Sequence, residues 1–570
     1  MTIETIKLEI QGMTCDDCVT TIEKKLEGLE GLKSKSVSYP EHSGLFSFDT
    51  EKTSKKEIIE RINSTVHYKV VEEINNGNNN DSESIDKESE QKTYLQNSDY
   101  NLIIIGGGSA AFSAAIKASE MGKNVLMINE GLPIGGTCVN VGCVPSKTLI
   151  RTAEQLYNAN HPNFTSIKPG ENKINFKEVI RQKTELVEDL RQKKYVDVIS
   201  GDPNVTVIKG RAKIVDKNTV VLRTPNGEVN GETKTGQVIL IATGSSTFIP
   251  DIPGLKESGY LITDTLYELQ ELPEHLIIMG GRYIALENAQ MFARLGSKVT
   301  VLQRSNRIIP TEMPDVSESI ADYLREEGVE IKTGVKINSV SKKDDKVSLQ
   351  ITIDENDEAI EGTHLLVATG RKGNSNNMGL ENLSIALHGN GFIKTDEYNR
   401  TNISNIFAAG DITGEHLFVY TAAYAAALAV ENAFGESLKE KDYTVLPWVV
   451  FTDPQIAGVG MDEDQAFKAG IDYDVSKIEL KDIPRSLAAR NTKGFIKLIR
   501  NKGNGKLIGA RILASEGSEL LMEISLAIKY GITAKELKNM FHPYLTLSEG
   551  VKLAAITFDK DVGKLSCCAV

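Results

Sequence analysis

Hydrophobic and polar positions in the first part of the chain follow two different periods. Ile6, Leu8 and Ile10 alternate with polar residues, as in a half-buried strand, whereas residues 16–29 carry apolar side chains at helical spacing. The other predicted elements are strands around 37, at 45–48 and at 66–72, and a helix at 54–63. The order strand, helix, strand, strand, helix, strand predicts a ferredoxin-like βαββαβ domain over residues 1–72.

The pattern changes twice after this domain. Residues 73–98 are polar and acidic, which predicts a flexible linker because such a segment buries too little apolar surface to order itself. The next segment is α/β, since the apolar run 102–105 leads directly into Gly106-Gly107-Gly108 and an Ala-rich helix. A second strand–glycine–helix unit starts at 276–279, and a mixed α+β segment ends the chain.

Composition and charge narrow the class of protein. With 570 residues, 40% hydrophobic and 25% charged, the chain has the composition of a multidomain globular protein. Its net charge of −13 offers no basic surface, so no nucleic-acid partner is expected. Residues 1–10 lack the regions of a targeting signal, and the apolar stretch 420–430 is too short to span a bilayer. We therefore expect a soluble cytoplasmic protein without membrane insertion.

The six cysteines fall into three local pairs, which is the most informative feature of the composition. The pairs are Cys15/Cys18, Cys138/Cys143 and Cys567/Cys568. So few cysteines in so long a chain are not the disulfide framework of a small secreted protein. Three local thiol pairs instead predict metal-binding or redox chemistry in a reducing compartment.

The first glycine-rich turn is a predicted dinucleotide site. Gly106, Gly108 and Ala111 lie between a strand and a helix, where small residues let backbone N–H groups approach a pyrophosphate. The residue that holds the ribose is expected about 20 positions later, at the end of the next strand. Asn129 and Glu130 follow that strand, and the spacing leaves both open, with Glu130 as the acidic candidate.

The segment Gly135–Lys147 is more specific than the turn. Its two thiols, Cys138 and Cys143, have four residues between them, and we expect them to close a disulfide on one helical face. A helix N-terminus and a cation such as Lys147 lower the pKa of a thiol placed beside them. A structural disulfide or a zinc half-site is the alternative interpretation, although no second ligand pair lies nearby.

This segment resembles the redox-active disulfide helix of the flavoprotein disulfide reductases, and the resemblance covers residues 99–570. It implies FAD at the first site, with Cys143 facing the flavin and Cys138 as the exchange thiol. Asp411 is implied to hydrogen-bond the ribityl chain of the flavin. The other positions that match flavin-site motifs of the family are Gly136, Thr137, Lys147, Thr243, Gly244 and Gly370.

The second glycine-rich turn is the predicted nicotinamide dinucleotide site. Gly280 and Gly281 match the glycine pattern, but Arg282 stands where a glycine is usual. The next strand ends in Gln303-Arg304 rather than in an acid, which suits the 2′-phosphate of NADPH, and a solvated turn is the alternative. Glu287 on the following helix resembles the glutamate that pairs with the flavin-site lysine in the family.

The resemblance also implies a domain order and an oligomer. Residues 451–460 are similar to the start of the family's dimer-interface domain, so a homodimer is expected. The implied fold is α/β, with two Rossmann-like dinucleotide-binding domains, an α+β dimerisation domain and the ferredoxin-like domain in front as a metal carrier. The implied boundaries are 99–250 and 371–440 for the FAD-binding domain, 251–370 for the NADPH-binding domain and 441–570 for the dimerisation domain with its cysteine tail.

The electron acceptor must be identified outside the shared core. Disulfide-reducing members of the family carry His-Pro-Thr-x-x-Glu near the C-terminus, where the carboxylate orients a histidine that protonates a leaving thiol. This chain keeps His542 but has Tyr544 in place of the threonine and Leu547 at the glutamate position. The orienting acid is therefore expected to be absent or displaced to Glu549, and a packing role for His542 is the alternative.

The outer thiol pairs favour a soft metal ion as the acceptor. Cys567 and Cys568 are adjacent, so they close a disulfide poorly but offer two thiolates to a soft cation such as Hg(II). The segment 12–18, Gly-Met-Thr-Cys-Asp-Asp-Cys, resembles the loop of heavy-metal-associated domains and suits Cu(I) or Hg(II) better than zinc. The alternative for Cys15 and Cys18 is a reduced core pair.

Together these features resemble the mercuric reductases within the flavoprotein disulfide reductase family. The resemblance implies NADPH-dependent reduction of Hg(II), delivered on small-molecule thiols, to Hg(0). The C-terminal cysteines of the partner subunit are implied to pass the metal to Cys138 and Cys143, in a pocket that Tyr195 and Tyr544 line. A disulfide or dihydrolipoamide oxidoreductase, and a soft-metal carrier or sensor, are the alternative functions.

Overall fold

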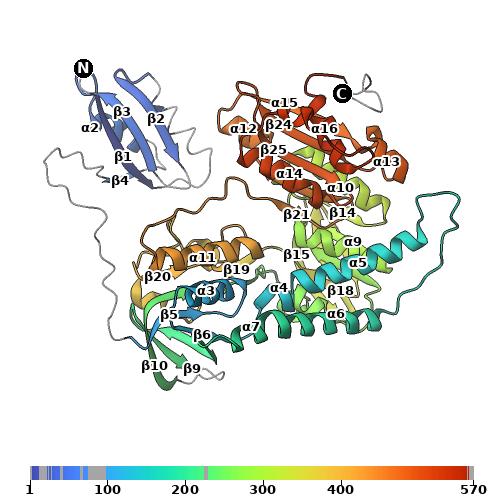
Figure 1. The fold of residues 1–570 in the computed structure, drawn as a ribbon, viewed down its shortest axis with the longest axis horizontal. Helices are drawn as coiled ribbons and strands as arrows, with labels where there is room; N and C mark the ends of the chain where they lie inside the picture. The colour runs from blue at the N-terminus through green and yellow to red at the C-terminus, as the bar shows by residue number, and fades with distance from the viewer. Residues whose placement is uncertain are drawn as a thin grey trace. The chain divides into compact units, whose positions relative to one another are not determined.

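The computed structural model describes residues 3–11, 22, 25–26, 28–38, 43–64, 69–74, 98–223, 229–561 and 563. It divides into two compact units, Met1–Thr93 and Tyr94–Val570, which are described separately (Figure 1). The predicted thiol pairs Cys15/Cys18 and Cys567/Cys568 lie outside the described residues. Within the described ranges, no helix has the length and apolar content that crossing a membrane requires.

The N-terminal unit contains an antiparallel sheet with the strand order β2-β3-β1-β4. The strands are β1 (Ile3–Gln11), β2 (Leu32–Ser38), β3 (Ser43–Asp49) and β4 (Lys69–Ile74). Helix α2 (Lys55–Asn63) begins after Ser54, whose hydroxyl accepts the N–H of Glu57 and so satisfies a free donor of the first turn. The strands and α2 agree with the predicted order, and most of the first predicted helix, 16–29, lies outside the described residues.

The first nucleotide-binding domain is built on a sheet with the order β7-β6-β5-β10-β9-β8, and β20 pairs with β10. The strands are β5 (Tyr100–Ile105), β6 (Val125–Asn129), β7 (Val205–Lys209), β8 (Arg211–Ile214), β9 (Thr219–Arg223), β10 (Val229–Ile241) and β20 (Ile406–Ala408). Side chains of β5 alternate between two hydrophobic clusters, which explains its continuous apolar run. Helices α3 (Ser109–Glu120) and α11 (Val419–Phe434) pack together through alanines (Figure 1).

A second parallel sheet, with the order β14-β13-β12-β18, forms the other nucleotide-binding domain. Its strands are β12 (His275–Met279), β13 (Lys298–Leu302), β14 (Glu330–Lys332) and β18 (His364–Val367). An antiparallel sheet accompanies it, made of β15 (Lys336–Lys343), β16 (Lys346–Ile353) and β17 (Asn356–Gly362). Its helices are α8 (Thr263–Leu266), α9 (Tyr283–Leu295) and α10 (Pro314–Glu326). The two chain crossings between the domains pair as β11 (Ser245–Thr247) and β19 (Arg371–Gly373).

The C-terminal part is an antiparallel sheet with helices packed on it, in the order β21-β22-β25-β24-β23. Its strands are β21 (Trp448–Val450), β22 (Gln455–Gly460), β23 (Tyr473–Glu479), β24 (Phe495–Asn501) and β25 (Leu507–Ala514). Its helices are α12 (Glu463–Lys468), α13 (Pro484–Ala489), α14 (Gly517–Lys529), α15 (Ala534–Asn539) and α16 (Leu547–Ile556). Two Rossmann-like domains followed by an α+β domain confirm the predicted fold class.

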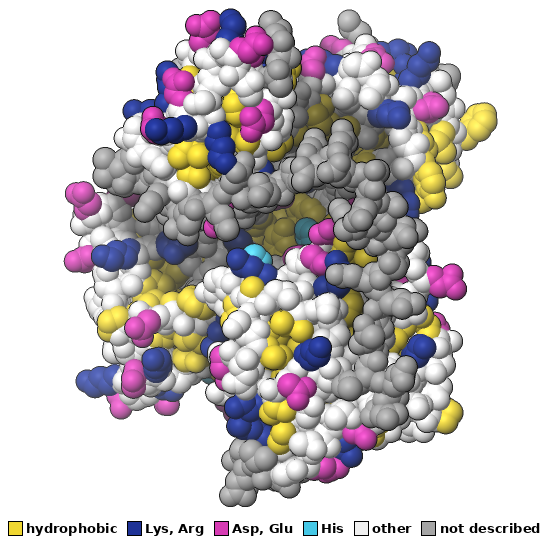
Figure 2. All heavy atoms as spheres, turned by 90° about the vertical axis from the view of Figure 1, so that its left-hand side faces the viewer, with side chains coloured by type: hydrophobic (Ala, Val, Ile, Leu, Met, Phe, Trp, Pro, Cys, Tyr) yellow, Lys and Arg dark blue, Asp and Glu magenta, His cyan; other side chains and the backbone are white. Residues whose placement is uncertain are grey.

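Four helical segments lie in the chain between β6 and β7 of the first domain. They are α4 (Gly136–Asn140), α5 (Cys143–Asn160), α6 (Phe176–Arg191) and α7 (Asp197–Ser200), with a single π-helical turn at Gln192–Val196. Helix α5 packs against α9 of the second domain (Figure 1), so the segment that carries the central thiol pair lies where the two nucleotide-binding domains meet. On the face drawn in Figure 2, charged side chains of both signs are interspersed among the described residues.

Candidate active site

The first glycine-rich turn forms a close backbone cradle. The N–H of Gly106 donates to the carbonyl of Ile128 at 2.8 Å, and a Cβ at Gly106 would lie 2.2 Å from the carbonyl oxygen of Ala242. A Cβ at Gly136 would lie 2.6 Å from Cα of Gly108, so two glycine turns meet backbone to backbone. Helix α3 starts there without a side-chain cap, which leaves its first N–H groups for a pyrophosphate. The residues present therefore fit a dinucleotide.

Asn129, the last residue of β6, and Glu130, which follows it, have different partners in the structure. Asn129 packs over the backbone of Gly107, and its amide donates to the carbonyl of Leu132 at 3.1 Å. The side chain of Glu130 forms an ion pair with Arg211 on β8. The structure thus directs Glu130 to Arg211 and leaves Asn129 beside the glycine turn.

Asp411 lies where the parallel strand β20 ends. Its Oδ2 accepts the hydroxyl of Ser245 at 2.8 Å, and Arg371 donates to that hydroxyl at 2.6 Å and lies 3.6 Å from the carboxylate. Ser245 and Arg371 belong to the two crossing strands, so the crossings position Asp411. Its other oxygen, Oδ1, has no partner within the described part of the chain and can accept from a ligand.

The predicted crossing residues hold the two chain crossings together through hydrogen bonds to backbone groups. Thr243 donates its hydroxyl to the carbonyl of Asn374 at 2.9 Å, and the carbonyl of Gly244 accepts the N–H of Asn374 at 3.1 Å. The carbonyl of Gly370 accepts the N–H of Phe248 at 2.9 Å. These residues shape the junction between the domains beside the first site.

The central thiols lie on two helices rather than on one helical face, so that part of the prediction is wrong. Cys138 is in α4, and Cys143 is the first residue of α5, because the chain leaves helical geometry at Val141 and Gly142. Asn140 supports the short helix α4, since its amide donates to the carbonyl of Gly136 at 2.8 Å. This break places Cys143 at the N-terminus of an 18-residue helix, where the helix dipole favours a thiolate.

The two thiols have opposite tendencies to ionise. A hydrogen bond from the thiol of Cys138 lowers the pKa of Cys143 to about 7, with further lowering by Lys147 and opposed by burial. The same hydrogen bond, together with burial, raises the pKa of Cys138. The pair therefore carries one thiolate near neutral pH, on Cys143, with Cys138 as its proton donor.

One ion pair joins the thiol segment to the other domains. The ammonium of Lys147 lies 2.7 Å from Oε2 of Glu287 on α9, which is the pairing expected from the sequence. The second oxygen of Glu287 accepts the N–H of Phe451 at 3.0 Å, and the ring of Phe451 lies 4.5 Å from the ammonium. Each nucleotide-binding domain and the C-terminal domain thus contribute one of the three residues.

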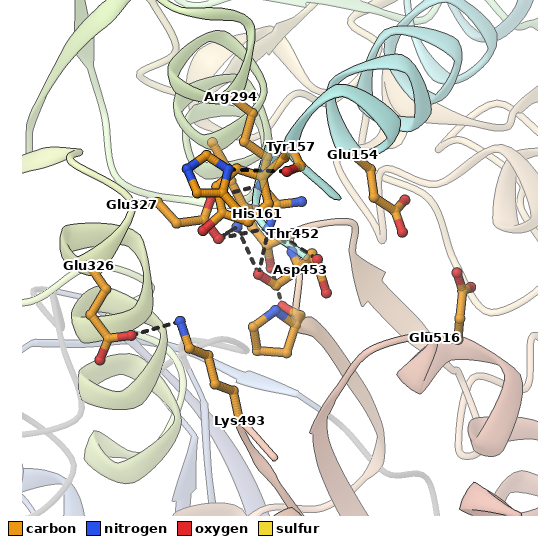
Figure 3. A network of polar contacts seen from close by, with 12 residues as sticks. Glu154, Tyr157, His161, Arg294, Glu326, Glu327, Thr452, Asp453, Lys493 and Glu516 are labelled. Atoms are coloured by element: carbon orange, nitrogen blue, oxygen red, sulfur yellow. Dashed lines mark hydrogen bonds and ion pairs between the residues drawn. The ribbon is translucent and has the colours of Figure 1, made fainter. Parts of the chain in front are cut away.

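A second cluster of ion pairs lies farther along α5 and α9. Arg294 forms buried ion pairs with Glu327 at 2.7 Å and with Asp453 at 3.0 Å, and its guanidinium covers the ring of Tyr157 (Figure 3). Lys493 pairs with Glu326 beside it. These residues come from the same three domains as the Lys147–Glu287 ion pair. The two sets of ion pairs therefore fix α5 against α9 at two places along the helices.

Tyr195 lies beside the thiol pair, whereas Tyr544 does not. A Cβ at Gly135 would lie 3.4 Å from the ring of Tyr195, and burial followed by the charge of Cys138 raises the pKa of its hydroxyl. Tyr195 belongs to the π-helical turn, a feature often found at functional sites. Tyr544 is exposed on the loop between α15 and α16, and Figure 1 shows these two helices in another part of the molecule than α4.

His542 has a carboxylate partner that the sequence did not reveal. Its Nε2 lies 2.7 Å from Oε1 of Glu523, which is on α14, 19 positions earlier. Glu549 instead accepts the N–H of Leu545 at 3.2 Å. The expectation that the acid is absent or displaced to Glu549 is therefore wrong. Nothing in the local sequence pattern marks Glu523, because the folding of the C-terminal domain brings α14 to this loop.

The second glycine-rich turn repeats the geometry of the first. A Cβ at Gly280 would lie 2.4 Å from the carbonyl oxygen of Ala368, and the N–H of Gly280 donates to the carbonyl of Leu302 at 2.9 Å. Gln303 packs over Gly281, while Arg304 is exposed beside it. Gln303 is buried at the end of the strand and Arg304 is exposed, and their contact with a dinucleotide stays a prediction.

The structure has two dinucleotide-binding domains and, where they meet, one thiolate with a thiol as its proton donor. This combination defines a nucleotide-dependent dithiol–disulfide oxidoreductase. The chain belongs to the pyridine nucleotide-disulphide oxidoreductase family, whose model matches residues 100–427. The dimerisation-domain model of that family matches residues 446–555, and a heavy-metal-associated domain model matches residues 7–67. Members of the family use FAD and NADPH, which suits the two glycine turns.

Similar proteins cover most or all of the chain. The mercuric reductase of Staphylococcus aureus is 39% identical over 570 residues, which are 100% of both chains. The mercuric reductase of Streptomyces lividans is 41% identical over 471 residues, which are 82% of this chain and 98% of that protein. The Cu(II) complex of the HOCl-induced flavoprotein disulfide reductase RclA from Escherichia coli has a TM-score of 0.72 at 30% identity, covering 80% of this chain and 99% of that one.

The hydrogen bond between the thiols predicts how Cys143 responds to substitution. In Cys138→Ala the pKa of Cys143 rises by about one to two pH units, because a charge-assisted hydrogen bond to the thiolate is lost. Alkylation of Cys143 by iodoacetamide, followed against pH by peptide mass spectrometry, measures this change. In the wild type the rate falls as the pH drops below about 7, where the thiolate becomes protonated.

Cys138→Ser is the matched control, because a hydroxyl can still donate to the thiolate. It should leave the alkylation profile close to that of the wild type. An unchanged or lowered pKa in Cys138→Ala would contradict the assigned hydrogen bond.

Proposed function

We propose that this chain is a mercuric reductase that reduces thiol-bound Hg(II) to Hg(0) with electrons from NADPH. The observation that carries the proposal is the thiolate at Cys143, paired with a second thiol in a chain that has two more thiol pairs near its ends. Thiolates are the ligands that soft cations prefer. Similarity to mercuric reductases over all 570 residues supports the same conclusion.

The overall reaction balances with one nicotinamide dinucleotide per metal ion. NADPH, one proton and one Hg(II) dithiolate give NADP⁺, Hg(0) and two thiols. When bound, FAD supplies two-electron transfer between the nicotinamide and the thiol site. The Cys143 thiolate displaces the first ligand, which leaves as a thiolate. Cys138 then displaces the second ligand and passes its proton to it, so this ligand leaves as a thiol while the metal stays coordinated.

Other residues would orient this exchange. Lys147 favours the thiolate form of Cys143 by its charge, and Glu287 holds Lys147 in place. The ring of Tyr195 would form one wall of the pocket beside Cys138. Tyr544, together with the C-terminal cysteine pair, would come from the partner subunit.

The proposed assembly is a homodimer in a reducing compartment such as the cytoplasm. The match of residues 446–555 to a dimerisation domain supports the dimer. Large apolar side chains of that domain are exposed in the single chain, namely Leu487, Met522, Leu526, Tyr530, Phe541 and Leu545. A second copy of the chain would cover such a surface. A reducing compartment keeps all three thiol pairs available for exchange.

One observation favours a second candidate function, the reduction of a disulfide. The imidazole of His542 and the carboxylate of Glu523 form a pair that can protonate a leaving thiol. This function uses Cys138 and Cys143 in the same way but gives the outer thiol pairs no role. The acceptor therefore separates the two functions.

The C-terminal cysteines provide the test of the proposed function. In Cys567→Ala/Cys568→Ala, oxidation of NADPH with Hg(II) in excess thiol should fall by about tenfold or more, because a chelating pair that captures the metal is lost. Reduction of the bound flavin by NADPH, followed by its absorbance, should be unchanged, since neither cysteine belongs to the glycine-rich motifs of the nucleotide sites.

The acceptor assay also includes an outcome that contradicts the proposal. Rapid turnover of a small disulfide by the wild type, with no oxidation of NADPH that depends on Hg(II), would establish the second candidate function instead. His542→Gln is the companion variant, because it should slow disulfide turnover in that case and leave flavin reduction intact.

The strand end at Gln303 predicts the preference for NADPH. A neutral amide does not repel a 2′-phosphate, and the guanidinium of Arg304 can donate to it. In Arg304→Ala the KM for NADPH should rise by about tenfold, the loss of one charge-assisted hydrogen bond, while the KM for NADH stays constant.

Arg307→Ala serves as the control for this preference. Arg307 donates to the carbonyl of Pro310 at 3.2 Å, so its loss should affect both nucleotides alike. Equal effects of Arg304→Ala on NADPH and NADH would show that Arg304 only faces solvent.

A further inference from the structure

The loop 303–313, which follows β13 and carries Arg304, contains a strained residue. Ile309 has a φ of 41°, in the left-handed region that a β-branched side chain adopts only at a cost in energy. Its side chain is completely buried, and its N–H donates to the carbonyl of Gly281 in the second glycine-rich turn at 2.8 Å. A strained conformation of this kind persists only where the surrounding contacts fix it. The loop is therefore held against the nucleotide turn by contacts outside Ile309 itself.

One of these contacts comes from the C-terminal domain. The N–H of Glu312 donates to the carbonyl of Ile309 at 3.0 Å, and the carboxylate of Glu312 accepts from Nε of Arg511 on β25 at 2.6 Å. Both charged side chains are almost completely buried, with 6% and 2% of their surface exposed. Because breaking a buried ion pair leaves an uncompensated charge, the pair strongly favours one position of Glu312. A series of contacts thus runs from Arg511 through Glu312 and Ile309 to the carbonyl of Gly281.

Arg511 belongs to a row of side chains that crosses the C-terminal sheet. In the strand register Trp448 pairs with Gly458, and Gly458 pairs with Arg511. Arg511 pairs with Lys497 on its other side, so these side chains lie on one face of the sheet. Gly458 makes room for the indole, since a Cβ there would lie 2.4 Å from Cζ2 of Trp448. The guanidinium of Arg511 lies 5.4 Å from the centre of the indole ring.

The indole of this row contacts the same nucleotide turn at a second place. Trp448 stacks on Tyr283, with the ring centres 5.5 Å apart and an angle of 10° between the ring planes. Tyr283 is the first residue of α9 and directly follows Gly280-Gly281-Arg282. Backbone N–H groups at such a helix start are the ones that bind a pyrophosphate. One row of the C-terminal domain therefore supports both the start of α9 and the end of the loop 303–313.

We propose that Arg511 and Glu312 are positioning residues for the nicotinamide dinucleotide, although Arg511 belongs to the C-terminal domain. Their ion pair holds the loop 303–313 in its strained conformation, so that Gly281 and Arg304 are in place before the nucleotide binds. Without the pair the loop would have to become ordered on binding, and this cost in entropy weakens the affinity. The inference rests on the family's use of NADPH and on the second turn as its site, and it is independent of the metal substrate.

Reduction of the bound flavin separates nucleotide affinity from hydride transfer. Full-length, FAD-containing protein is mixed anaerobically with NADPH or NADH in a stopped-flow instrument, and the dependence of the rate on concentration gives a Kd and a limiting rate for each nucleotide. In Glu312→Gln both Kd values should rise about five- to tenfold, and by the same factor, because the loop as a whole loses its support. The limiting rate and the FAD content should remain those of the wild type. Arg304→Ala, in contrast, is expected to affect NADPH alone.

The double variant Glu312→Gln/Arg511→Met tests whether the two residues act through one contact. If they do, the double variant should weaken binding no more than the larger of the two single substitutions. Two residues that only stabilise the fold independently would give effects that multiply. The double variant also removes both charges, so neither member of the pair is left buried without the other.

Lys497→Met/Glu463→Gln is the matched control. Lys497 is the next residue of the row, is as deeply buried as Arg511 and pairs with Glu463 at 2.6 Å. Its other partner, Asp315, also lies 3.6 Å from Lys477 and so keeps a cation beside it. This variant removes a buried ion pair from the same face of the sheet but leaves Glu312 in place. Both Kd values should therefore change by about twofold or less.

Three outcomes would overturn the proposal. The first is that Glu312→Gln leaves both Kd values unchanged, and the second is that the control variant raises them as much as Glu312→Gln does. The third is that the effects of Glu312→Gln and Arg511→Met multiply in the double variant. Because flavin reduction is measured without any acceptor, these outcomes are independent of whether the protein reduces Hg(II).

Discussion

The ion pair between Lys147 and Glu287 is the contact on which the candidate site depends. It connects the helix that carries Cys143 to the second nucleotide-binding domain, and Glu287 also accepts the N–H of Phe451 from the C-terminal domain. A partly buried carboxylate with both oxygens engaged strongly favours one arrangement of its partners. The relative positions of the three domains at the thiol pair are therefore set by this contact, and the buried Arg294 cluster reinforces it farther along the same helices.

In this arrangement of the three domains, the ionisation of Cys143 follows from the charges and hydrogen bonds around it. The break before α5 puts Cys143 at a helix N-terminus, Cys138 donates to it, and Lys147 supplies positive charge. All three effects favour a thiolate on Cys143 against the cost of burial. A thiolate with an adjacent thiol can accept a soft metal ion by stepwise exchange, and it can equally open a disulfide. The core alone therefore does not select the acceptor, and the outer thiol pairs carry that distinction.

Much of the fold and part of the site follow from the sequence because their determinants are local. Glycine turns after apolar strands mark both nucleotide sites, and the spacing of Cys138 and Cys143 marks the redox segment. The partner of His542 could not be predicted, since Glu523 comes from a helix that only tertiary packing brings near. The same holds for Glu130, whose carboxylate pairs with Arg211 on β8, a strand that does not pair with β6. Contacts between side chains of elements far apart in the sequence produce no periodic pattern from which they could be predicted.

The most direct measurement of the central claim is the yield of mercury vapour per NADPH. The purified protein is given NADPH and Hg(II) in excess thiol, and Hg(0) carried off in a gas stream is quantified against the NADPH consumed. The account predicts one Hg(0) for each NADPH, as the two-electron balance requires, with no change in the thiol pool beyond the ligands released. Consumption of NADPH without Hg(0) would contradict it.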